Sequence, residues 1–308
     1  MTHTQAQKEK RSAALSSVLA AIGLTSFKIV VGVLTNSLGI LAEAAHSALD
    51  LVAALMTLFA VRVSDLPPDK EHNFGHGKIE NLSALFETVL LLATSAWIIN
   101  EAVDRLFFKK AEVTTSVWSF IVMGTSIAID YTRSRILYRA ARKYHSQALE
   151  ADALHFSTDI WSSSVVILGL IGVTVSRFIP NFLWMSEADA IAAMVVALIV
   201  IYISANLGWR TIQALLDAAP KGVSEKIIKS VGRMKDIEDC HAVRIRPSGA
   251  SWFVDLHVTM DGDRTLNEAH AVTEKIERKV KELLPDSDVT VHVEPVELAE
   301  TQRHKLTG

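Results

Sequence analysis

The sequence has a single cysteine, Cys240, among 308 residues. One thiol cannot form an intramolecular disulfide, and its isolation excludes a zinc module built from several cysteines. The chain also lacks a strong excess of either charge, with 31 lysine and arginine residues against 34 aspartate and glutamate residues. This near balance argues against a nucleic-acid partner.

Several sequence patterns are missing as well. The chain has no HExxH-type motif or comparable pairing of metal ligands with a general base, which argues against an intramembrane metal-dependent hydrolase. It has no repeat of about 20 to 50 residues and no low-complexity tract. The apolar segment behind the basic N-terminal stretch is too long for a signal-peptide core and no convincing cleavage site follows, so we expect it to be retained as a first membrane span.

Long apolar segments are abundant in the first part of the chain. Hydrophobic residues make up 50% of the sequence and form blocks up to about residue 215. A bilayer core ~30 Å thick requires about 20 apolar residues per helix. Residues 1–215 are therefore predicted to form an α-helical membrane domain, and residues 216–308 a separate soluble domain. The six segments expected to span the membrane are 12–34, 38–63, 82–104, 116–138, 148–174 and 187–210.

The distribution of lysine and arginine predicts the orientation of these spans, because short cytoplasmic loops carry an excess of basic residues. The side that holds the N-terminal tail and the second and fourth connections is the more basic. It carries Lys8, Lys10, Arg11, Lys70, Lys78, Arg133, Arg135, Arg139, Arg142, Lys143 and Arg210. We therefore expect a multi-pass protein of a prokaryotic inner membrane with both termini in the cytoplasm.

The last ninety or so residues have the pattern of a small α/β domain. Residues 224–234 have helical spacing, and residues 241–249 and 251–262 have the period of strands. Residues 265–284 form a strongly amphipathic helix and residues 286–297 a third strand. The order αββαβ predicts a small sheet with two helices on one face. The apolar stripe of the second helix is expected to consist of Leu266, Ala269, Thr273, Ile276, Val280 and Leu283.

Two copies of the pattern His-x3-Asp lie near the centres of the second and fifth expected spans. They are His46 with Asp50 and His155 with Asp159. Residues four apart lie on one face of a helix, and ionisable side chains inside a membrane usually face a cavity or a partner. Facing each other, the two helices offer two nitrogens and two carboxylates, a complete tetrahedral set for Zn²⁺. The alternative is a pair of unrelated interhelical hydrogen bonds.

Other charged residues inside the spans have simpler interpretations. Lys28 and Glu87 lie near expected helix ends, where snorkelling or a helix–helix ion pair explains them. Asp130 lies one turn before Arg133, and an ion pair between them is adequate.

A second group of candidate ligands lies in the connection between the second and third spans. Asp69, His72 and His76 occur within the stretch "DKEHNFGHGKIE", and Gly75 and Gly77 allow the loop to fold tightly. The density of histidine favours a metal site, although a solvated polar loop has the same composition.

A third group comes from the soluble domain. Strand alternation places His257, His292 and Glu294 on the sheet face away from the helices. His241 opens the first strand, where alternation puts it on the side of Val243 and Ile245, so that its membership depends on a local twist. His270 lies on the edge of the second helix. These five residues are candidate metal ligands, and the alternative is a set of solvated surface histidines.

Together these segments resemble the cation diffusion facilitator family of metal/proton antiporters over nearly the whole chain. The resemblance implies a six-span domain, a cytoplasmic αββαβ domain like a metallochaperone, and a homodimer. It implies a transport site at His46, Asp50, His155 and Asp159 of the kind found in the zinc-preferring branch. It also implies a loop site and a binuclear cytoplasmic site in the two groups above, with Glu294 standing where aspartate is familiar. The segments that carry the resemblance are "AEAAHSALD", "DKEHNFGHGKIE", "DALHFSTD", "CHAVRIRPSG", "FVDLHVTM", "NEAHAVTE" and "VHVEP".

The expected function is therefore the export of Zn²⁺, with Cd²⁺ or Co²⁺ as further substrates, in exchange for protons, by a protein that is not an enzyme. Neutral imidazoles and ionised carboxylates bind metal, so protonation competes with binding. An Fe²⁺ or Mn²⁺ exporter of the same family is the first alternative, although two imidazoles argue against a preference for hard metals. A membrane metal sensor that does not transport is another.

Overall fold

The computed structural model describes residues 3–107, 117–176 and 185–296. The chain divides into two compact units, the first ending at Ile212 and the second beginning at Gln213.

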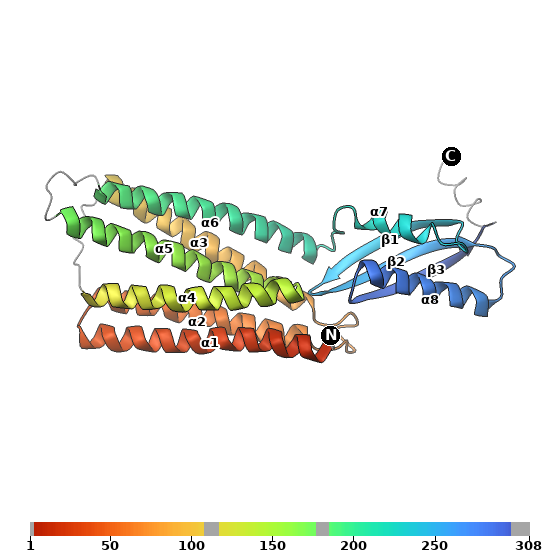
Figure 1. Ribbon diagram of the computed structural model, residues 1–308, viewed down its shortest axis with the longest axis horizontal. Helices are drawn as coiled ribbons and strands as arrows, with labels where there is room; N and C mark the ends of the chain where they lie inside the picture. The colour runs from red at the N-terminus through yellow and green to blue at the C-terminus, as the bar shows by residue number, and fades with distance from the viewer. Residues whose placement is uncertain (1–2, 108–116, 177–184, 297–308) are drawn as a thin grey trace. The chain divides into compact units, whose positions relative to one another are not determined.

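The first unit consists of six long helices that run side by side (Figure 1). Each segment expected to span a membrane coincides with one of them, and the helices extend several residues beyond some of the expected ends. They are α1 (His3–Leu34), α2 (Leu38–Ser64), α3 (Lys78–Phe107), α4 (Val117–Tyr144), α5 (Gln147–Ser176) and α6 (Met185–Leu215).

Within the described residues, four helical segments are long and apolar enough to cross a membrane. They belong to α1, α2, α3 and α6, and α4 and α5 are not among them. In α4 the charged pair Asp130 and Arg133 interrupts the apolar residues, and several basic residues follow. The six-span arrangement therefore stays a proposal for these two helices.

Small residues allow α1, α2, α4 and α5 to pack closely at one end of the first unit, as is common between membrane helices. The buried apolar cluster at this end consists of Ala14, Val18, Ala54, Leu58, Val61, Leu137, Ala141, Ala148, Leu149, Ala153 and Phe156. On the other side of α5, Leu207 of α6 packs against Ala84 of α3 and Ala151 of α5. The two helices that carry the His-x3-Asp pairs, α2 and α5, are thereby in contact.

A buried network of charged and polar side chains joins four helices at the same end. Lys10 of α1 is 5% exposed, and its Nζ lies 2.7 Å from Asp65 Oδ1 and 3.0 Å from Glu80 Oε1. Ser64, at the end of α2, donates a hydrogen bond of 3.0 Å to Glu80, and Ser146, just before α5, donates to the other Glu80 oxygen. Since every charge has an opposite partner, this network is compatible with burial.

The second unit has the expected order αββαβ. It contains α7 (Val223–Val231), β1 (Asp239–Ser248), β2 (Ser251–Met260), α8 (Leu266–Leu283) and β3 (Ser287–Pro295). The strand order is β1-β2-β3, with β1 antiparallel and β3 parallel to β2. Apolar residues of α7, α8 and the sheet form one core, which includes Ile227, Val231, Ile245, Val254, Leu256 and Ile276.

The expected stripe of α8 is wrong at its ends. Leu266 is 85% exposed and Leu283 is 40% exposed, whereas Val272, Ile276 and Val280 are buried. At 100° per residue, Leu266 lies about 80° from the centre of the face that these three valine and isoleucine residues form. Leu266 therefore lies off the face that packs against the sheet, whereas Leu283 lies about 20° from the centre of that face but in the last turn of the helix.

Candidate metal centre

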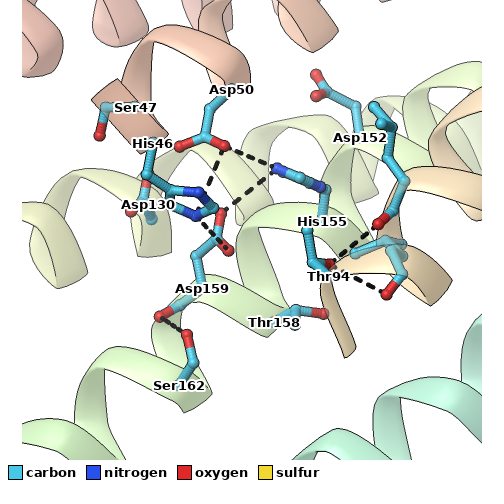
Figure 2. A network of polar contacts seen from close by, with 12 residues as sticks. His46, Ser47, Asp50, Thr94, Asp130, Asp152, His155, Thr158, Asp159 and Ser162 are labelled. Atoms are coloured by element: carbon cyan, nitrogen blue, oxygen red, sulfur yellow. Dashed lines mark hydrogen bonds and ion pairs between the residues drawn. The ribbon is translucent and has the colours of Figure 1, made fainter. Parts of the chain in front are cut away.

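The two His-x3-Asp pairs lie opposite each other on α2 and α5. His155 Nε2 is 3.1 Å from Asp50 Oδ1 and 3.6 Å from Asp159 Oδ2. His46 Nε2 is 3.9 Å from Asp50 Oδ1 and 4.0 Å from Asp159 Oδ1. Each imidazole thus lies between the carboxylate of its own helix and that of the other helix, as Figure 2 shows.

The donor atoms and burial of this group suit a metal ion. Ligand atoms of His46, Asp50 and Asp159 lie within 4.8 Å of one another, and His155 adjoins both carboxylates. Asp50 is 9% exposed and His155 is 5% exposed. Two imidazole nitrogens and two carboxylate oxygens match the ligand types and number of a tetrahedral zinc site. The structure therefore brings all four of the expected residues together.

Arg133 and Lys28, two basic residues near this group, form ion pairs. Arg133 Nη1 lies 3.2 Å from Asp130 Oδ1, which confirms the ion pair expected within α4. The Arg133 guanidinium also lies 3.4 Å from the centre of the Phe156 ring. Lys28 Nζ lies 2.7 Å from Ser47 Oγ and 3.3 Å from Glu43 Oε2, so the interpretation of Lys28 as one partner of a helix–helix ion pair is correct.

Two buried carboxylates, Glu87 and Asp152, lie next to this group. The interpretation of Glu87 from the sequence was wrong, and Asp152 was not identified. Glu87 of α3 is 0% exposed, so snorkelling does not explain it. It accepts a hydrogen bond from Thr57 of α2 rather than forming an ion pair there. Asp152 of α5, also 0% exposed, lies one turn before His155 and was not singled out. In the sequence, the feature that could have indicated Asp152 is its position three residues before His155, which places the two side chains on the same helix face.

The loop between α2 and α3 brings its three candidate ligands together. Asp69 lies 3.3 Å from His72 Nδ1 and 3.4 Å from His76 Nε2, and all three offer ligand atoms within 4.8 Å. Gly75, at φ 74°, donates its backbone N–H to the His72 carbonyl at 2.9 Å and closes the turn. The backbone N–H of His72 also donates to Asp69 and lowers the pKa of that carboxyl.

Three residues of the second unit form another candidate site. Ligand atoms of His241, His257 and Glu294 lie within 4.8 Å of one another. Glu294 Oε1 lies 3.0 Å from His257 Nδ1, and Glu294 Oε2 lies 3.4 Å from His241 Nε2. His292 packs against His257 with ring centres 4.7 Å apart.

The position of His241 results from a bulge in β1. The register between β1 and β2 shifts between His241 and Arg244, and Ala242 has φ 48°. A bulge of this kind interrupts strand alternation, so His241 pairs with His257 instead of pointing to the side of Val243. The expectation from alternation alone was therefore wrong for this residue.

His270 is not brought into this cluster within the described part of the chain. Its side chain is 71% exposed, and its Nε2 lies 3.7 Å from Glu274 on the same helix. The five expected ligands of this domain are thus divided into a cluster of four, counting His292 at its edge, and one exposed histidine on α8.

Known families and proteins resemble this chain over almost its full length. A family model described as the cation efflux transmembrane domain matches residues 14–216, and a model of the cytoplasmic domain of cation efflux proteins matches residues 219–296. The cation-efflux pump FieF of Yersinia enterocolitica is 30% identical over 297 residues, which cover 96% of this chain and 95% of that protein. FieF of Yersinia pestis (strain Pestoides F) is 30% identical over 299 residues, with the same coverage.

Among solved structures, the metal-bound C-terminal domain of the CzcD transporter from Thermotoga maritima is 32% identical. The match covers 24% of this chain and 87% of the CzcD domain, with a TM-score of 0.23.

Proposed function

The chain belongs to the cation efflux family, also called the cation diffusion facilitator family, and we propose that it exports Zn²⁺ from the cytoplasm in exchange for protons. The observation that supports this proposal most directly is the group of His46, Asp50, His155 and Asp159, whose nitrogen and oxygen atoms lie together between two helices. Cd²⁺ and Co²⁺ are further substrates under this proposal, because they accept the same mixed nitrogen and oxygen ligands.

The coupling to protons follows from the chemistry of the ligands. Each imidazole must be neutral and each carboxylate ionised to bind the ion, so that protons and metal compete for the same atoms. A site that opens alternately to each side of the membrane then releases metal where protons are abundant and takes up metal where protons leave. The proposed orientation places both termini and the second unit in the cytoplasm.

The second unit is proposed to regulate transport and to hold two copies of the chain together. His241, His257, His292 and Glu294 supply nitrogen and oxygen ligands, and the Glu294 carboxylate lies within 3.8 Å of a ring nitrogen of each of the three histidines. These groups fit a zinc ion bound at the sheet surface, where it would hold β1, β2 and β3 together. Metal binding that favours one arrangement of two subunits would shift the population of transporting states.

Transport into sealed vesicles tests the proposal. Purified protein is reconstituted into proteoliposomes with an acidic lumen, and Zn²⁺ is present at the same initial concentration inside and outside the vesicles. We expect the proton gradient to drive zinc accumulation, and an ionophore that collapses the gradient to abolish it. Accumulation that is indifferent to the ionophore would identify a uniporter or channel, and the absence of any flux would leave a sensor or an intramembrane enzyme.

The same vesicles test the choice of metal. Zn²⁺, Cd²⁺, Co²⁺, Fe²⁺ and Mn²⁺ are compared at equal concentrations. Because imidazole nitrogen favours borderline metals over hard ones, Zn²⁺ is expected to be transported in preference to Fe²⁺ and Mn²⁺. A preference for Fe²⁺ or Mn²⁺ would replace zinc as the assigned substrate and leave the transport function intact.

A further inference from the structure

Glu87 and Asp152 are two fully buried carboxylates that the four-residue metal group does not use. Glu87 receives a hydrogen bond from Thr57 at one oxygen, and Ser17 donates to Asp152 Oδ2 at 3.3 Å. The second oxygen of each, Glu87 Oε2 and Asp152 Oδ1, is buried without a hydrogen-bond partner among the described residues. A hydroxyl thus holds each carboxylate in place and leaves one oxygen available to a ligand.

Contacts between α3 and α5 place these two carboxylates at the same level. Asn81 Nδ2 donates to Gln147 Oε1 at 2.9 Å, and Ala84 packs in one cluster with Ala151. Continuing this register by one turn places Glu87 beside the segment of α5 between Asp152 and His155. Asp152 and His155 both act electrostatically on the Glu87 carboxylate, in agreement with this placement.

The pair lies between the four-residue group and the proposed cytoplasmic end of the helices. On α5, Asp152 precedes His155 by three residues, or ~4.5 Å along the axis. On α2, Thr57 follows Asp50 by seven residues, or ~10 Å, toward the end where Ser64 and Ser146 bind Glu80. Both displacements therefore lead away from the four-residue group in the same direction.

The basic groups near the pair are shared with other carboxylates. Arg133 acts on Asp152, but its guanidinium also pairs with Asp130 at 3.2 Å and donates to Ser17 at 3.1 Å. Among the described residues, the basic group that acts on Glu87 is the His155 imidazole, which also lies between Asp50 and Asp159. Because unpaired buried charge is costly, a cation bound between the two carboxylates would remove a substantial penalty.

A third unpartnered atom lies nearby. His155 Nε2 faces Asp50 and Asp159, whereas its Nδ1 is buried without a hydrogen-bond partner in the described part of the chain. The two nitrogens are on different edges of the imidazole, so this ring can serve ligands on both sides.

We propose that Glu87 and Asp152 form a second binding site for a divalent transition-metal ion, at which an ion entering from the cytoplasm is held before it reaches the four-residue group. Glu87 Oε2 and Asp152 Oδ1 supply the charged ligands, and water completes the coordination of the ion. His155 borders both sites and is the residue at which the ion passes from one to the other. This inference rests on the proposed function for the direction of movement, but not for the binding itself.

Equilibrium zinc binding to the full-length protein in detergent tests the site. The variant Glu87→Gln with Asp152→Asn keeps the size of both side chains and removes their charge. We expect it to bind about one Zn²⁺ ion fewer per chain than the wild type, with the remaining ions bound as before. The matched control is Asp130→Asn, which removes a buried carboxylate already paired with Arg133 and should retain the wild-type number of ions.

The outcomes separate this site from the transport proposal. If the double variant binds as many ions as the wild type at unchanged affinity, the carboxylates serve only protons or structure and the second site is refuted. Asp50→Asn with Asp159→Asn should lose a different ion and retain this one; unchanged binding and flux in that variant would refute the transport site alone. Should the double variant fail to fold, Glu87→Gln alone keeps the Thr57 contact and is expected to weaken zinc binding by about tenfold or more.

Discussion

A single nitrogen of His155 connects the two helices of the metal centre. Its Nε2 lies 3.1 Å from Asp50 on α2 and 3.6 Å from Asp159 on α5. The two carboxylates supply the negative charge that a divalent ion requires, whereas the histidines contribute ligand atoms without charge when they are neutral. Loss of one carboxylate therefore removes both a ligand and half of the charge that compensates the ion.

The first prediction concerns these two carboxylates. Asp50→Ala or Asp159→Ala is expected to reduce zinc flux in proteoliposomes to background, because three remaining ligands with one charge bind the ion too weakly. Size-exclusion chromatography should show a folded protein in both cases. Thr158→Ala is the control, since Thr158 precedes Asp159 and its hydroxyl donates to Leu154 O of its own helix at 3.0 Å. Normal flux in either aspartate variant would exclude these residues as ligands.

Among the elements, the bulge of β1 determines which ligands meet in the second unit. Ala242 adopts φ 48°, a region in which a side chain costs about 1–2 kcal/mol and glycine almost nothing. The bulge turns His241 toward His257, with ring centres 5.6 Å apart. Local backbone strain in this strand is thus linked directly to the geometry of a candidate metal site.

Substitution of Ala242 tests this link. Ala242→Val is expected to lower the free energy of unfolding of a fragment beginning at Pro220 by about 1–2 kcal/mol, because a β-branched residue tolerates positive φ poorly. It should also weaken zinc binding by that fragment. Ala242→Gly removes the steric cost that alanine already incurs at positive φ, so it is expected to retain zinc binding with equal or higher stability. Urea unfolding and zinc titration measure the two effects, and equal behaviour of the valine and glycine variants would show that the bulge is unimportant.

The capping box of α8 predicts a pH dependence. The backbone N–H and hydroxyl of Thr265 donate to Glu268 at 2.9 and 2.8 Å and lower the pKa of its carboxyl from 4.5. The ionised form is therefore favoured in the folded state, so this stabilisation is present above pH 4.5 and disappears as pH falls through the lowered pKa. The wild type should melt at a higher temperature than Glu268→Gln near pH 7, and the difference should vanish as the pH falls below the lowered pKa of the Glu268 carboxyl. A difference that stays constant over this range would exclude the carboxylate as its cause.

Periodicity and spacing predicted most of these elements, and the failures have local causes. Long apolar runs identify helices directly. The spacing of His-x3-Asp places both side chains on one face of their helix, and this can be recognised without knowing which helix packs against it. Glu87 was misread because its surroundings depend on the register of α3 against α5, which a single helix does not encode. The membership of His241 was left open because it depends on a local bulge. Glycine, which favours the left-handed conformation, is absent there, and alanine adopts it instead.

At the scale of the whole molecule, the chain divides near Gln213 into a helical unit and an αββαβ unit. The second has a continuous apolar core of its own, built from two helices and three strands. A core of this kind is what an independently folding domain requires. The candidate zinc ligands of this unit come from its own three strands.

The second unit is therefore expected to fold and respond to metal on its own. A fragment beginning at Pro220 should fold and dimerise, and zinc at a hundredfold excess over its Kd should stabilise it by about 2.7 kcal/mol, seen as a higher Tm. His257→Ala with His292→Ala should remove this response and reduce transport by the full chain without abolishing it. Thr290→Ala, an exposed residue of β3, should leave the response intact. Complete loss of transport in the double variant would instead assign these histidines to the transport pathway.

The burial of Lys10 also bears on how the protein is made. During synthesis α1 reaches the translocon before Asp65 and Glu80 exist, so Lys10 is then an unneutralised positive charge beside the first span. Such a charge retains the N-terminus on the cytoplasmic face and helps to orient the helix. Once α2 and α3 have been inserted, the same lysine lies 2.7 Å from Asp65 and 3.0 Å from Glu80. Under the proposed orientation, Lys10 would thus help to orient the first helix during insertion and would then join α1 to the end of α2 and the start of α3 in the folded protein.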